Sequence, residues 1–180
     1  NVQVNVFTED LGYPSSRLLK SLQTPNRTVI FAGHSWTDGK IKDGEIVPGN
    51  GIRTGEGDAI GTFGVTTRKR DKEGKAYGEY SQIPKIQAST FMVFACSPGS
   101  DFDDVLQPQL SPNSTVYYND AGEFGQTWVP TSETAAFEAA KIMVATNDPQ
   151  QAVKKANEVL KNQMFGHADG DKMQTIRPKP

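Results

Sequence analysis

The sequence of 180 residues contains one cysteine, Cys96, and only two histidines. A single cysteine cannot form an internal disulfide, and it cannot build a cysteine-rich metal site. No stretch approaches the roughly 18 consecutive apolar residues that indicate a membrane-spanning helix. We therefore expect a soluble protein without disulfides, located in a cytoplasm or delivered into one, with no membrane span, no bound metal and no cofactor.

An excess of charge of either sign is also missing. The chain carries 19 basic and 21 acidic residues, a net charge of −2. Proteins that bind nucleic acids or membrane surfaces electrostatically carry a basic excess, so the balance predicts no nucleic-acid partner. Only 36% of the residues are hydrophobic, but nine Phe and two Trp argue against disorder. The chain begins at Asn1 rather than Met, which predicts a processed piece or an excised domain.

Short apolar runs separated by helical patterns indicate the fold class. The segments expected to be strands are 2–8 (VQVNVFT), 28–33 (TVIFAG), 90–95 (TFMVFA) and 114–118 (STVYY). The segments expected to be helices are 15–22, 101–110, 132–145 and about 148–164. Asp148 and Pro149 suit the N-cap and first position of the last helix. Alternating strands and helices predict an α/β sandwich with a mostly parallel sheet.

The remaining segments look different. Residues 37–64 are glycine-rich and have no sustained apolar period, which predicts loops and hairpins. Residues 68–75 (RKRDKEGK) are typical of a solvated hairpin tip. We expect one domain over residues 1–165 and a polar, frayed tail over 166–180.

Two of the buried strands end in residues that can do chemistry. The first is followed by His34 and Ser35, and the second by Cys96. Function in parallel sheets collects beyond the carboxyl ends of the strands. An imidazole beside a thiol makes it a competent nucleophile, and backbone N–H groups of Ser35 and Cys96 would face a developing oxyanion. The alternative is that Cys96 is a small buried hydrophobe and that His34 is structural.

The segments TVIFAGHS (28–35) and TFMVFACSPGS (90–100) resemble the caspase-like clan of cysteine peptidases, which includes CHAT-type domains. The resemblance covers roughly residues 28–164. It implies a caspase-like three-layer sandwich with a glycine-rich hairpin insertion. It also implies a peptide or protein substrate, a catalytic His34 and a nucleophilic Cys96. Ser35 departs from the clan, which usually has glycine after the histidine.

The resemblance also implies a place for substrate selection, after the strand that follows the cysteine strand. Asp120 lies there and would favour Lys or Arg in the substrate, although a turn aspartate that caps its own backbone is the alternative. The segment that begins at Gly33 (GHSWTDGKIKDGEIVPGNG, 33–51) is similar to domains of bacterial polymorphic toxins. We therefore expect a bacterial toxin or effector context.

Two other functions stay open. VIFAGHSW is similar to the nucleophile elbow of serine hydrolases, with Ser35 as nucleophile and Asp120 and His167 completing a triad. Against this, no helix is expected after Ser35, and only 34 residues precede it. The second is a caspase-like fold kept as a non-catalytic binding module. The glycine-rich residues 49–64 lack the ending of a phosphate-binding loop. The oligomeric state is open.

Overall fold

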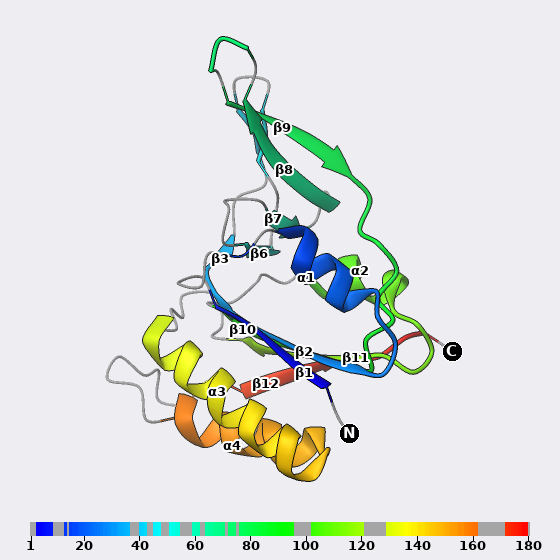
Figure 1. The fold of residues 1–180 in the computed structure, drawn as a ribbon, viewed down its shortest axis with the longest axis vertical. Helices are drawn as coiled ribbons and strands as arrows, with labels where there is room; N and C mark the ends of the chain where they lie inside the picture. The colour runs from blue at the N-terminus through cyan, green and yellow to red at the C-terminus, as the bar shows by residue number, and fades with distance from the viewer. Residues whose placement is uncertain are drawn as a thin grey trace.

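A five-stranded sheet with helices on both faces forms the body of the protein, and a second, antiparallel sheet stands on one side of it (Figure 1). The computed structural model describes residues 3–8, 13, 15–36, 40–42, 45–47, 51–54, 59–61, 64–70, 72–74, 76–95, 102–120, 129–161 and 172–179. Within these ranges, no helix is long and apolar enough to cross a membrane.

The main sheet is mostly parallel, as the sequence predicted. Its strands, in spatial order, are β1 (Gln3–Thr8), β2 (Arg27–Gly33), β10 (Thr90–Ala95), β11 (Thr115–Asp120) and β12 (Lys172–Ile176). The first four are parallel, and β12 pairs antiparallel with β11. The parallel strands therefore follow one another across the sheet in chain order, all in one direction.

This strand order explains where the helices lie. They are α1 (Ser15–Leu22), α2 (Phe102–Leu106), α3 (Val129–Thr146) and α4 (Pro149–Leu160). Connections between neighbouring parallel strands are right-handed, so connections that advance in one direction cover one face of the sheet. Accordingly, α1 and α2 lie over one face, and α3 and α4 lie over the other (Figure 1). The α/β sandwich predicted from the sequence is confirmed.

The two faces of the sheet bury two separate apolar cores, because successive side chains of a strand point to opposite faces. In β2, Val29 and Phe31 join the core under α1 and α2, whereas Ile30 and Ala32 join the core under α3 and α4. The helices of the second core contribute mainly small side chains: Ala135, Ala136, Ala139, Ala140, Ala152 and Ala156. Small side chains let these helices approach the sheet closely.

Helix α4 begins as its sequence predicted. The carboxylate of Asp148 accepts hydrogen bonds from the backbone N–H groups of Gln150 (2.9 Å) and Gln151 (3.3 Å), and Pro149 occupies the first helical turn. The Gln151 side chain also donates to Asp148 (2.9 Å), and this bond is the main reason that the pKa of Asp148 is lowered. The helix ends at Leu160, earlier than expected.

The glycine-rich segment and the residues on either side of it form the second sheet. Its antiparallel strands, in spatial order, are β3 (Ser35–Trp36), β6 (Gly51–Arg53), β7 (Ala59–Gly61), β8 (Gly64–Arg70) and β9 (Ala76–Ser81). A separate hairpin joins β4 (Lys40–Lys42) to β5 (Glu45–Val47). Ile52 anchors the sheet in the core under α1, and the Thr54 hydroxyl is hydrogen-bonded to that of Ser15 (2.8 Å) at the start of α1.

The C-terminal segment differs from its expected state. Residues 172–176, which we expected within a frayed tail, form the edge strand β12. Ile176 is only 3% exposed and pairs with Val116, and the backbone N–H of Met173 donates to the Asn157 side chain (3.1 Å). The α/β domain therefore extends beyond residue 165, to β12.

Candidate active site

The register between β2 and β10 defines the site. Six consecutive residue pairs align the two strands, from Thr28 with Thr90 to Gly33 with Ala95. Neighbouring strands lie about 4.8 Å apart. Gly33 and Ala95, the residues directly before His34 and Cys96, are therefore side by side at the carboxyl ends of the two strands. Cys96 itself lies outside the described residues, so its proximity to His34 stays a prediction.

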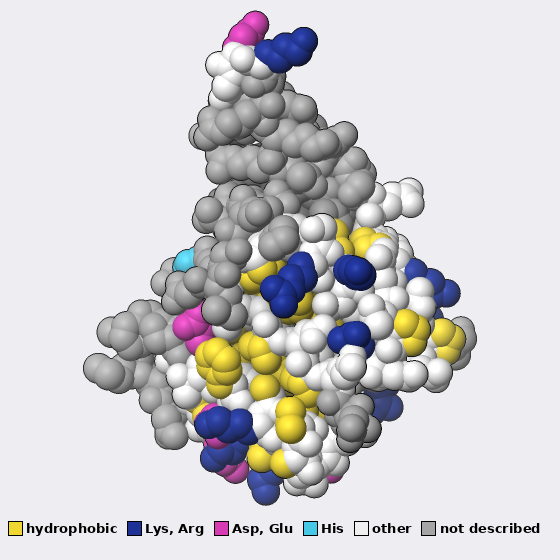
Figure 2. All heavy atoms as spheres, viewed as in Figure 1, with side chains coloured by type: hydrophobic (Ala, Val, Ile, Leu, Met, Phe, Trp, Pro, Cys, Tyr) yellow, Lys and Arg dark blue, Asp and Glu magenta, His cyan; other side chains and the backbone are white. Residues whose placement is uncertain are grey.

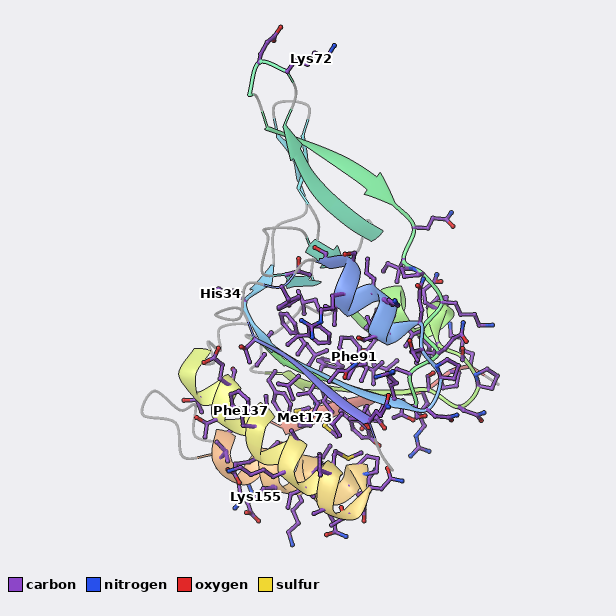
Figure 3. The ribbon with its side chains drawn as sticks, in the orientation of Figure 1. His34, Lys72, Phe91, Phe137, Lys155 and Met173 are labelled. Atoms are coloured by element: carbon purple, nitrogen blue, oxygen red, sulfur yellow. The ribbon has the colours of Figure 1, made fainter. Side chains whose placement is uncertain are left out.

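His34 occupies the junction between the two sheets. It directly follows β2 and directly precedes β3, and its side chain is exposed. In Figure 3 it lies at the end of β2, at the margin of the molecule, whereas Phe91 of β10 lies in the interior. A histidine in this position is accessible to a substrate that reaches the edge of the sheet.

Ser35 is the first residue of β3, and its backbone is paired with that of Ile52 in β6. In an antiparallel ladder, pairs that exchange two N–H···O bonds alternate with pairs that exchange none. Ser35 can offer its N–H to an oxyanion only if its pair is of the second kind. A serine-hydrolase elbow requires a sharp turn from a strand into a helix at the nucleophile. At Ser35 the chain is instead extended, as part of β3.

Asp120 is the last residue of β11. The register aligns Val93 with Tyr118, so two residues further along Asp120 reaches the level of Ala95. Its partner across the antiparallel pair with β12 is Lys172. Sequence analysis missed this lysine because we expected it in a tail.

The helices that follow β10 and β11 along the chain lie on opposite faces of the sheet (Figure 1). After β10 the chain goes to α2 on one face, and after β11 it goes to α3 on the other (Figure 1). In open α/β sheets, ligands bind beyond the carboxyl ends of the strands, where neighbouring connections part in this way. The topology therefore favours the ends of β10 and β11, where Cys96 follows and Asp120 lies, as the place for a substrate.

A buried hydroxyl lies in the first turn of α3. Helix α3 begins at Val129, three residues before the expected start, so Ser132 lies inside its first turn. Ser132 is 0% exposed, and its Oγ has no hydrogen-bond partner among the described residues. It precedes the sheet-facing Ala135 and Ala136 by three and four residues, which places it on the same side of the helix. No sequence signal distinguishes this serine from an ordinary helix-start residue.

The described residues contain no group of three or more His, Cys, Asp or Glu side chains that could hold a metal ion. His167, the third member of the alternative serine triad, lies outside the described residues. The chain matches no protein-family model, no curated protein and no solved structure.

Proposed function

We propose that this protein is a cysteine endopeptidase with a caspase-like arrangement of His34 and Cys96. The observation that carries the proposal is the pairing of Gly33 with Ala95, which precede the two residues in adjacent parallel strands. Both positions also follow, by two residues, side chains that face α3, namely Ala32 and Phe94. Strand alternation therefore favours the same side of the sheet for both groups.

In the proposed reaction, the Cys96 thiolate attacks the carbonyl carbon of the scissile peptide bond. The C–N bond then breaks, and the His34 imidazolium gives its proton to the leaving amine. This leaves a thioester between Cys96 and the acyl part of the substrate. Neutral His34 next takes a proton from a water molecule, whose oxygen attacks the thioester. The acid product leaves, and the sulfur is restored.

Backbone N–H groups of Ser35 and Cys96 would stabilise the oxyanion formed in each half of the reaction. Asp120 would favour a basic side chain in the substrate, by charge pairing in a pocket at the ends of β10 and β11. Lys172 opposes that preference, because it is the cross-strand partner of Asp120. We therefore expect Asp120→Asn to weaken cleavage after Lys or Arg and Lys172→Gln to strengthen it.

The backbone geometry at Ser35 favours this proposal over a serine hydrolase, because an extended strand replaces the strand-to-helix turn of an elbow. A non-catalytic binding module of the same fold is the remaining alternative. Both the peptidase and the binding module are compatible with the pairing of β2 and β10. Only the reactivity of Cys96 distinguishes these two functions.

The test is cleavage of unfolded casein and of fluorogenic peptides that vary the residue before the scissile bond. We expect Cys96→Ala and His34→Ala each to lower the rate by at least about 10³-fold, because the residues act as one unit. Ser35→Ala keeps its backbone N–H, and His167→Ala removes the other histidine. Both should stay within a few-fold of the parent and serve as matched controls.

Two reagents separate the alternatives. Iodoacetamide should inactivate the protein stoichiometrically, and a fluorophosphonate should not. Loss of activity in Ser35→Ala and His167→Ala, together with fluorophosphonate labelling, would establish the serine hydrolase instead. If no substrate is cleaved and neither reagent labels the protein, the binding module is the correct function.

A further inference from the structure

His34 connects the two sheets of the protein at the end of β2. On one side of it, Gly33 is paired with Ala95 in the main sheet. On the other side, Ser35 is paired with Ile52 of β6 in the second sheet. The His34 side chain is exposed, and it is the cyan side chain at the margin of the molecule in Figure 2. The orientation of its imidazole therefore depends on how the second sheet is held against the α/β body.

The segment around β6 holds the second sheet in place. Ile52 is 0% exposed and packs in the core under α1, and Thr54, directly after β6, is also 0% exposed. The Thr54 hydroxyl is hydrogen-bonded over 2.8 Å to the hydroxyl of Ser15, at the start of α1. Figure 1 shows β3 and β6 beside α1, at the end of β2. One apolar contact and one polar contact thus tie the second sheet to the body.

These two contacts constrain β6 to different degrees. Apolar packing is non-directional, so Ile52 could slide within the core and still be buried. A hydrogen bond between two hydroxyls requires an oxygen–oxygen distance of about 2.5–3.0 Å and a favourable angle. Ser15 is only 4% exposed and Thr54 is fully buried, so bulk water does not readily replace either partner. The hydroxyl pair is therefore the contact that sets the position of β6 along α1.

From β6 the constraint reaches His34 through the backbone. Paired strands move together, so a displacement of β6 also displaces β3, whose first residue directly follows His34. A group that transfers protons must be placed accurately, because a misplacement of about 1 Å costs about 10²-fold in rate. Given the proposed function of His34, we propose that the hydroxyl pair of Ser15 and Thr54 positions its imidazole, through β6 and β3. Both are buried, so they act as positioning residues.

The first test observes His34 directly and needs no substrate. The full chain is prepared with isotope-labelled histidine, and the NMR signal of the His34 ring is identified by its loss in His34→Ala. We expect Thr54→Val and Ser15→Ala each to shift or broaden this signal, because the imidazole is then held less firmly. Thr54→Ser keeps a hydroxyl at the same position, so it should leave the signal as in the parent.

Ser114→Ala is the matched control for a general loss of stability. Ser114 is 1% exposed, and its hydroxyl donates to the backbone oxygen of Ile86 (3.1 Å). It precedes β11, which begins level with Thr90, whereas His34 follows the residue that is level with Ala95. The control therefore removes a buried hydrogen bond at the opposite end of the strands. It should leave the His34 signal unchanged.

The second test is kinetic and uses the peptide substrates described above. Thr54→Val and Ser15→Ala should each lower kcat by about 10- to 10²-fold and leave KM within about twofold. The double variant should be no slower than the slower single variant, because both substitutions remove the same bond.

The proposal is overturned if Thr54→Val leaves the His34 signal unchanged, or if Ser114→Ala changes it as much. Failure of Thr54→Ser to preserve the signal would also overturn it, because packing of the threonine methyl would then be responsible. If the parent chain cleaves no substrate, the peptidase function fails, and the NMR comparison still decides whether the hydroxyl pair positions His34.

Discussion

Replacing Ser132 by alanine should stabilise the protein, although most substitutions of buried residues destabilise. The Ser132 side chain is 0% exposed, and its Oγ has no hydrogen-bond partner among the described residues. A buried hydroxyl without a partner costs about 1–3 kcal/mol, and alanine gains about 0.5 kcal/mol in helix propensity. After allowance for the lost contacts of the oxygen, we expect a gain of about 1–2 kcal/mol in the free energy of unfolding. That gain corresponds to about 3–6 °C in Tm for a domain of this size.

The assay is urea unfolding followed by circular dichroism, with thermal melts in parallel. Ser114→Ala is the matched control, because Ser114 is 1% exposed but its hydroxyl donates to the backbone oxygen of Ile86 (3.1 Å). Loss of that bond should lower the free energy of unfolding by about 1 kcal/mol. The two identical substitutions should therefore act with opposite sign. Equal destabilisation by both would show that Ser132 has a partner, and it would refute the reasoning.

Two further predictions concern pH. Burial raises the pKa of Tyr117, whose hydroxyl oxygen accepts a hydrogen bond from the Gln150 side chain (3.1 Å). The unfolded chain then ionises first, so the contribution of Tyr117 to stability should be constant below about pH 10 and be lost as the pH rises through the folded pKa. In Tyr117→Phe, this alkaline loss of stability should become smaller, and an unchanged alkaline limb would contradict the assignment. The pKa of Asp148 is lowered, chiefly by the hydrogen bond from the Gln151 side chain, so its stabilisation should be complete above about pH 4 and be lost as the pH falls toward the folded pKa. Asp148→Asn should flatten this acid limb of the urea-unfolding midpoint, and an unchanged acid limb would contradict the assignment.

The elements predicted well from the sequence are those with strong local signals. The run TFMVFA predicts β10 because a strand covered on both faces needs continuous apolar residues. Asp148 and Pro149 fix the start of α4. The Asp148 side chain accepts hydrogen bonds from free N–H groups of the first turn, and Pro149 has no backbone N–H that would need a partner. The hairpin tip at 72–74 follows from charge and glycine.

The features that the sequence did not reveal depend on contacts between distant segments. Edge strand β12 has only Met173 and Ile176 as apolar residues, so its pattern is weak until β11 is beside it. The same is true of the position of Lys172 opposite Asp120 and of the burial of Ser132. Chain order placed His34 and Cys96 after strands, but only the pairing of β2 with β10 makes those strands neighbours.

The adjacency of His34 and Cys96 can be measured without any substrate, by asking whether His34→Cys forms an internal disulfide with Cys96 under mild oxidation. The two Cα atoms should lie near the strand spacing of about 4.8 Å, within the range of about 4.4–6.8 Å that a disulfide requires. Thr8→Cys is the control, because Thr8 is two strands away from β10 and level with Phe94, two residues before Cys96, so the Cα–Cα distance should be about 12 Å. We predict that both free thiols disappear within the monomer for His34→Cys and persist for Thr8→Cys. Two free thiols in His34→Cys, or equal oxidation of both variants, would contradict the proposed dyad.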